Sequence, residues 1–122
     1  MQLIHNNLEN TQIKKATVIN LVDTFDYVPD SLVMKFILKK ITGSICSFSF
    51  DSMEDFKGKI SPFDTFIECI EGRAEVIIDE KSELIKEGQF IIIPAHSKNT
   101  IKAKEPFKML SVIIKSGYED VS

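Results

Sequence analysis

"TFIECIEGRAEVIIDEKSELIKEGQFIIIP", residues Thr65 to Pro94, is a series of short apolar runs separated by turn residues. The runs are rich in Ile, Val and Phe, which favours strands over helices because branched and aromatic side chains fit a pleated surface. Gly72, Asp79-Glu80 and Gly88 interrupt the runs where tight turns are expected. Because these connections are so short, we expect successive strands to pair antiparallel.

The same pattern continues on both sides of this segment and predicts nine short strands. They are Ala16 to Asn20, Leu32 to Lys39, Ser44 to Asp51, Thr65 to Glu71, Ala74 to Asp79, Ser82 to Ile85, Gln89 to Pro94, Thr100 to Ala103 and Lys108 to Lys115. One helical turn is expected from Leu21 to Phe25, since Pro29 prevents a longer helix. Nine strands in one small domain indicate an all-β sandwich or barrel.

Strict alternation is clearest in the stretch "SICSFSFD". Successive side chains of a strand point to opposite faces, so Cys46, Phe48 and Phe50 share one face. Ser47 and Ser49 share the other face. We therefore expect this strand to have one side in the core and one wetter side.

Length and composition indicate one domain, residues 1–122, with loose or exchanged ends at 1–15 and 117–122. Charged residues interrupt every apolar run before it reaches the roughly 18 residues of a membrane span. The first residues lack the basic, apolar and small-residue sequence of an export signal. We therefore expect a cytoplasmic protein without a membrane partner.

The charge distribution does not indicate a nucleic-acid-binding protein, and the cysteines indicate neither a metal site nor a disulfide-rich protein. The 15 basic and 18 acidic residues are spread along the chain and give a net charge of -3, so no nucleic-acid partner is expected. Cys46 and Cys69 have neither the spacing of a metal site nor the density of a disulfide framework. Both are expected to be buried, reduced thiols.

Gly72, Gly88 and Pro94 are spaced as in two motifs, G-x5-H-x-H-x3,4-E-x6-G and G-x5-P-x-G-x2-H-x3-N. Gly72 matches the end of the first motif, and Gly88 and Pro94 match the start of the second. From Lys59 to Ile113 the chain therefore resembles a small single-domain member of the cupin superfamily. The resemblance implies a double-stranded β-helix, the jelly-roll barrel of cupins.

The same register puts the metal-ligand positions of the motifs on residues that bind metals poorly. With the shorter gap of the first motif its two histidines fall on Lys59 and Ser61, and with the longer gap they fall on Gly58 and Ile60, which bind metals no better. The glutamate of the first motif falls on Thr65, and the histidine of the second falls on Asn99. A transition metal needs about three imidazole or carboxylate donors. Because these positions offer an ammonium, two hydroxyls and an amide, we expect no metal and no other cofactor there.

His96 lies where the second motif has a glycine, in a predicted loop after Pro94. An exposed loop histidine is the simpler interpretation. The alternative is a general base at the barrel mouth, near Asp64 or Lys59, since some metal-free cupins use histidine and charged partners in isomerase or epimerase reactions. That chemistry needs an orienting partner within hydrogen-bond reach of the imidazole.

The resemblance implies a ligand pocket at the motif positions. The residues expected to line it are Lys59, Ser61, Phe63, Thr65, Cys69 and Asn99. We expect a metal-free protein that binds or senses a small molecule in this pocket. The alternative is a metal-independent isomerase, epimerase or lyase that uses His96 or Lys59 as acid or base. A metal-dependent cupin with ligands displaced from the motifs is a third hypothesis.

The resemblance also implies a homodimer, because cupins usually assemble through sheet faces and exchanged N-terminal strands. The β-rich stretch "KATVINLV" before Leu32 is the candidate for such an exchange. An exposed strand edge favours being covered in this way.

Overall fold

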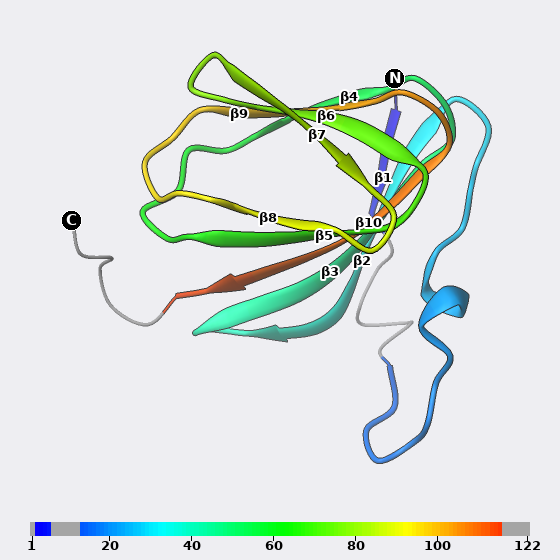
Figure 1. Ribbon diagram of the computed structural model, residues 1–122. Helices are drawn as coiled ribbons and strands as arrows, with labels where there is room; N and C mark the ends of the chain where they lie inside the picture. Colours follow the sequence, from blue (N-terminus) through cyan, green and yellow to red (C-terminus); the bar gives the residue numbers. More distant parts are fainter. Residues whose placement is uncertain (1, 6–12, 116–122) are drawn as a thin grey trace.

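Two facing β-sheets make up the computed structural model, which describes residues 2–5 and 13–115 (Figure 1). One sheet has six strands in the order β1-β2-β3-β10-β5-β8, and the other has four in the order β4-β9-β6-β7. All the pairs are antiparallel except β1 with β2, which is parallel. The strands are β1 (Gln2–His5), β2 (Ser31–Lys40), β3 (Gly43–Phe50), β4 (Asp55–Gly58), β5 (Thr65–Glu71), β6 (Arg73–Ile78), β7 (Lys81–Lys86), β8 (Phe90–Ile93), β9 (Asn99–Ala103) and β10 (Phe107–Ile114). This architecture is the predicted all-β jelly-roll barrel.

Eight of the nine predicted strands are confirmed, each with its ends within one residue of the expected bounds. The predicted strand from Ala16 to Asn20 is wrong. This stretch is irregular, and Ala16 has a φ of 58°, which no strand residue adopts. A single 3-10 turn, η1 (Leu21–Thr24), lies where one helical turn was predicted. Two strands, β1 and β4, were not predicted.

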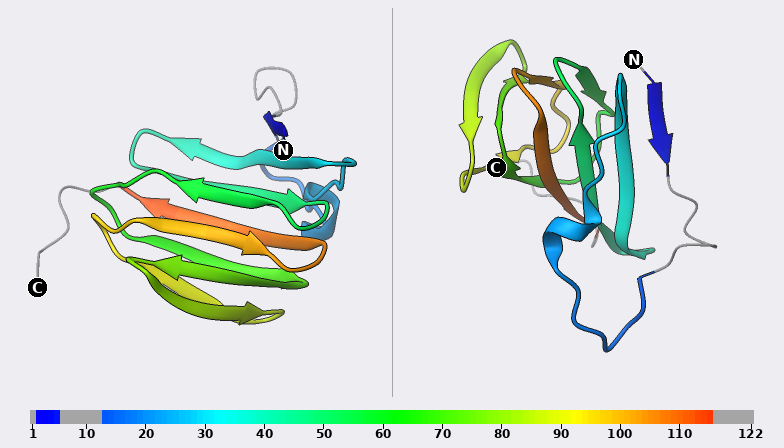
Figure 2. Two further views of the ribbon diagram at one scale, coloured as in Figure 1. Left: turned by 90° about the horizontal axis from the view of Figure 1, so that it is seen from above. Right: turned by 90° about the vertical axis from the view of Figure 1, so that its right-hand side faces the viewer.

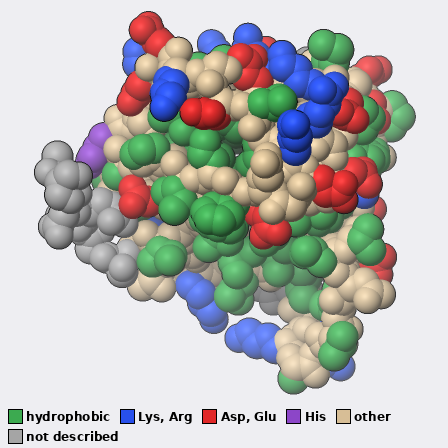
Figure 3. All heavy atoms as spheres, in the orientation of Figure 1, with side chains coloured by type: hydrophobic (Ala, Val, Ile, Leu, Met, Phe, Trp, Pro, Cys, Tyr) green, Lys and Arg blue, Asp and Glu red, His purple; other side chains and the backbone are tan. Residues whose placement is uncertain are grey.

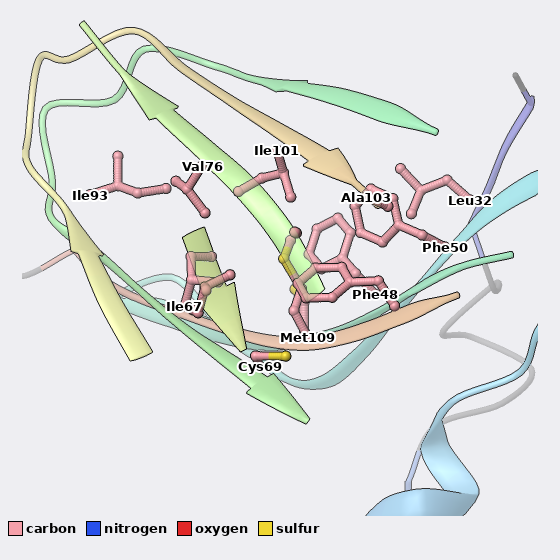
Figure 4. Close-up of a cluster of buried hydrophobic side chains, with 14 residues drawn as sticks. Leu32, Phe48, Phe50, Ile67, Cys69, Val76, Ile93, Ile101, Ala103 and Met109 are labelled. Atoms are coloured by element: carbon pink, nitrogen blue, oxygen red, sulfur yellow. The ribbon is translucent and has the colours of Figure 1, made fainter. Parts of the chain in front are cut away.

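The core lies between the two sheets (Figure 4). Inward side chains from β2, β3 and β10 meet those from β6 and β9, and the Phe50 and Phe107 rings lie 5.4 Å apart. Cys46, Phe48 and Phe50 are buried on the same face of β3, as the alternation predicts. The labelled residues in Figure 4 form a continuous row along the barrel, from Ile93 to Leu32.

The opposite face of β3 is not wet, which corrects the sequence prediction. Ser47 and Ser49 are each only 1% exposed. The segment before β2, residues 20–30, lies over this face and is called the strap here (Figure 2). The Ser47 hydroxyl donates a hydrogen bond to the Thr24 carbonyl oxygen at 2.9 Å, and the Asp26 N–H donates to Ser49 Oγ at 3.2 Å. The serines are therefore buried with their hydroxyl groups satisfied.

Gly72 lies in the tight connection from β5 to β6 and has a φ of 83°. A Cβ added at Gly72 would lie 2.2 Å from the carbonyl oxygen of Pro106, which belongs to the backbone. Glycine therefore suits this position for two reasons. It adopts the left-handed conformation without strain, and it leaves room for the backbone at Pro106.

In the part of the chain that the structure describes, no helix has both the length and the apolar character to cross a membrane. Of the ends expected to be loose or exchanged, residues 2–5 form β1 beside β2 in the same chain. Residues 117–122 lie outside the described residues.

Candidate binding site

The barrel is packed at one end and hollow at the other. Side chains with no exposed surface fill the packed end, among them Leu32, Phe50 and Phe107. Toward the opposite end of the same strands lies a pocket of about 790 Å³. A pocket of this size is in the range that holds small organic ligands, roughly 300–1,000 Å³.

The wall of the pocket is mainly apolar. Its apolar side chains are Met34, Phe36, Cys46, Phe48, Phe56, Ile60, Pro62, Phe63, Ile67, Ile93, Ile101, Met109 and Ile113. Hydroxyl and amide groups come from Ser44, Ser61, Thr65, Asn99 and Ser111, and three lysines, Lys57, Lys59 and Lys115, also line the pocket. Among the described residues, no Asp, Glu or His takes part in the lining. The pocket therefore combines an apolar wall with positive charge.

Two loops at the hollow end are tied together by hydrogen bonds that backbone N–H groups donate. The His96 N–H donates to the Ser61 carbonyl oxygen at 2.6 Å, and the Ala95 N–H donates to Asp64 Oδ1 at 2.8 Å. Within the first loop, the Phe63 N–H donates to Ser61 Oγ at 3.1 Å. These bonds hold the segment from Lys59 to Phe63 against the barrel. Asp64 is exposed and outside the pocket lining, so its carboxylate anchors a loop.

Asn99 occupies a position that Gly58 keeps open. The two residues are paired between β9 and β4, and a Cβ on Gly58 would lie 2.1 Å from Asn99 Oδ1. Asn99 and the buried Ile101 are two residues apart on β9, so both side chains lie on the inner face of this strand. The glycine thus leaves room for a polar amide inside a mostly apolar pocket.

The structure brings five of the six residues expected from the sequence into the pocket lining: Lys59, Ser61, Phe63, Thr65 and Asn99. The sixth, Cys69, lies outside the lining. It is fully buried toward the packed end, where its thiol donates to the Gly72 carbonyl oxygen at 3.3 Å.

Sequence reasoning missed much of the wall from β2, β3 and β10, and also Lys57 and Lys115. Alternation was a usable signal for part of this wall, because it places Cys46 and Phe48 on the inner face of β3.

His96 is exposed and does not line the pocket. It has a φ of 67°, a conformation that glycine adopts without strain and that histidine adopts more readily than most other side chains. The structure therefore brings Lys59 to the pocket but not His96.

The residues at the metal-ligand positions of cupins do not fit a transition metal. Lys59, Ser61, Thr65 and Asn99 do converge on one pocket. They supply neither an imidazole nor a carboxylate, and an ammonium group repels a cation. In residues 2–5 and 13–115, no group of three or more His, Cys, Asp or Glu side chains could hold a metal ion.

Burial and nearby positive charges both act on the pKa of Cys46, a residue of the pocket wall. Burial raises the pKa of its thiol, while a hydrogen bond with Ser44 and the charges of Lys39 and Lys115 act in the opposite direction. The pKa of Cys69 is raised to about 11, mainly by burial. Both groups are therefore neutral thiols at neutral pH.

No protein-family model matches the chain, and no curated protein matches it. Solved structures do match. The chain is 28% identical to a conserved protein of unknown function from Streptococcus pyogenes, with a TM-score of 0.79 over 88% of this chain and 94% of that one. It is 19% identical to a cupin superfamily protein from Desulfitobacterium hafniense, with a TM-score of 0.78 over 87% and 97% of the two chains. It is 21% identical to a cupin 2 conserved barrel domain protein from Leptotrichia buccalis, with a TM-score of 0.79 over 90% of this chain and 57% of that chain. The chain is a small protein with the cupin fold.

Proposed function

We propose that this cupin-fold protein binds a small organic molecule in its barrel pocket, without a metal ion. One observation carries the proposal. A pocket of about 790 Å³ with a mainly apolar wall lies at the position of a cupin metal site, but the residues at the ligand positions cannot replace imidazoles and carboxylates. Binding an apolar body would remove this wall from water, which is the main favourable term for such a ligand.

The alternative function, a metal-independent isomerase, epimerase or lyase, has less support from the pocket. It requires a general acid or base close to the ligand, together with a group that orients it. Lys59 lines the pocket, whereas His96 does not. Binding is therefore the function that this geometry favours.

Pocket binding can be tested with a neutral apolar dye, N-phenyl-1-naphthylamine, whose fluorescence rises in an apolar site. Ser111 and Val112 are neighbours on β10 with opposite alternation, and only Ser111 lines the pocket. We expect Ser111→Phe to fill the pocket and reduce dye binding by about tenfold or more, a loss of roughly 1.4 kcal/mol in binding free energy. Val112→Phe adds the same ring on the other face and should bind like the wild type.

Thermal unfolding of both variants shows whether each remains folded. No saturable dye binding to the wild type, or equal binding to Ser111→Phe and the wild type when both are folded, would contradict the proposal. Elemental analysis of the purified protein gives a second test. Stoichiometric Fe, Mn, Ni or Zn that is lost on substituting Asn99 would overturn the metal-free part.

We further propose that the protein is a homodimer and that it is located in the cytoplasm. Cys46 and Cys69 are free and buried, in keeping with a reducing compartment. Support for the dimer comes from β8, which is the last strand of its sheet and has Phe90 and Ile92 exposed. An exposed apolar edge strand favours association with another copy of the same chain.

A further inference from the structure

We propose that the ligand is an amphipathic anion: an apolar, ring-sized or medium-chain body that carries one carboxylate group. The proposal rests on the proposed function, since it assigns the ligand class for the same pocket. The apolar body would lie inside the barrel, and the carboxylate would lie near Lys59 and Lys115 at the hollow end.

Among the described residues, the charged side chains that line the pocket are all cations. Lys57 and Lys59 come from the end of β4 and the loop that follows it, and Lys115 follows the end of β10. In the described part of the chain, the salt bridges of the protein engage four other lysines and Arg73, and none of these three. In that part of the chain, no carboxylate forms a salt bridge with Lys59 or Lys115, so an anionic ligand group would be a partner for their charge.

A further cation lies near the wall of the pocket. Lys39 Nζ lies 4.6 Å from the centre of the Phe36 ring, and Phe36 lines the pocket. The charges of Lys39 and Lys115 both act on the thiol of Cys46, another residue of the wall. Positive charge thus reaches the pocket from β2 and from the end of β10 as well as from the loop after β4.

The uncharged polar groups of the lining also suit a carboxylate. The amide of Asn99 and the hydroxyl of Thr65 can each donate a hydrogen bond, and an ionised carboxylate only accepts. Both residues lie at the ends of their strands that face the loop with Lys59. Donors and cations are therefore at the same end of the pocket.

The apolar wall distinguishes this ligand from a small polar anion. The rings of Phe48 and Phe56 lie 5.2 Å apart on the wall, and Ile101 and Met109 are nearly fully buried deeper in the barrel. A sugar phosphate would lose water from its hydroxyl groups against these side chains without enough hydrogen bonds in return. An aromatic or aliphatic carboxylate buries carbon against the same surface.

The test compares two ligands of nearly identical shape, 2-naphthoate and 2-naphthamide, by competition with the neutral dye at neutral pH. We expect the charged naphthoate to bind about tenfold more tightly than the neutral naphthamide. Lys59→Met and Lys115→Met should each lower the affinity for naphthoate relative to that for naphthamide, measured on the same variant, by about three- to tenfold. The range corresponds to attraction between charges near a protein surface. Raising the salt concentration should weaken naphthoate binding alone.

Lys102→Met is the matched control, because it removes the same charge from β9 at a position outside the pocket lining. Equal affinities of the two ligands for the wild type would overturn the anionic ligand class while leaving the proposed function intact, provided that the dye binds. An equal loss of naphthoate affinity in Lys102→Met and Lys59→Met would overturn the assignment to these lysines. If the dye does not bind at all, the proposed function itself fails.

Discussion

Two glycines with the same backbone conformation meet very different surroundings. Gly72 and Gly88 have φ values of 83° and 84°. A Cβ at Gly72 would collide with the Pro106 carbonyl oxygen, whereas a Cβ at Gly88 would meet no atom within 4 Å. The motif therefore requires glycine at both positions for conformational reasons, and at Gly72 for space as well.

We expect Gly88→Ala to lower the free energy of unfolding by about 1–2 kcal/mol, the cost of one left-handed alanine. Gly72→Ala should cost about 2–5 kcal/mol, because the collision with backbone adds the cost of overpacking. Urea unfolding of the two variants and the wild type measures both losses. Equal losses would show that the segment at Pro106 moves aside without a measurable cost.

The strap covers the outer face of β3 and buries it. The Tyr27 hydroxyl donates to Glu71, and Lys108 Nζ lies 5.0 Å from the centre of the Tyr27 ring. Burial, followed by the hydrogen bond and the negative charge of Glu71, raises the pKa of Tyr27 well above its usual value. The folded protein therefore retains the phenolic proton at a pH where the unfolded chain loses it.

The sign of the effect on stability follows from this difference in protonation. The contribution of Tyr27 is fully present below about pH 10, the pKa of tyrosine in an unfolded chain, and is lost as the pH rises above it. We expect urea unfolding between pH 8 and pH 10.5 to show a steeper loss of stability for the wild type than for Tyr27→Phe. Glu71→Gln removes the charge and should give an intermediate slope. Parallel curves for the wild type and Tyr27→Phe would show that this hydroxyl does not titrate differently on unfolding.

The sequence predicted most strands well because each carries a run of branched or aromatic residues bounded by turn residues. It missed β4 (Asp55–Gly58), since four residues with one large apolar side chain, Phe56, do not form a recognisable period. It also misjudged Ser47 and Ser49. Alternation shows which side chains share a face of a strand, but a segment more than 20 residues away in the chain covers that face.

The same limit of strand alternation explains which residues of the pocket could be predicted from the sequence and which could not. The cupin register grouped Lys59, Thr65 and Asn99, and the structure places these three residues in the lining of one pocket although they are separated in the sequence. Cys69 shares a face of β5 with Thr65, yet it lies toward the packed end. Alternation thus identifies the inner face but not the depth along the barrel. Lys115 directly follows β10, which pairs with both β3 and β5, and it lines the same pocket.

The proposed homodimer depends on the outer face of the larger sheet. Phe90 and Ile92 on β8 are 61% and 52% exposed, and Phe90 stacks on Phe66 of β5 with the ring centres 5.0 Å apart. Figure 3 shows hydrophobic side chains gathered across the middle of one face of the molecule. Two copies that meet symmetrically at such a surface would each cover the apolar edge of the other.

We expect light scattering at micromolar concentration to give the mass of a dimer, and Phe90→Glu combined with Ile92→Glu to give the mass of a monomer. The reason is that a charge placed in the apolar centre of an interface must lose its water without gaining a partner. Ile41→Glu is the control and should leave the dimer intact, because Ile41 is 96% exposed in the turn between β2 and β3, and β10 and β5 separate β3 from β8 in the sheet. A monomeric wild type would contradict the dimer. If the double variant is still a dimer, the interface does not include Phe90 and Ile92 and lies on another surface, such as the edge of the sheet at β1.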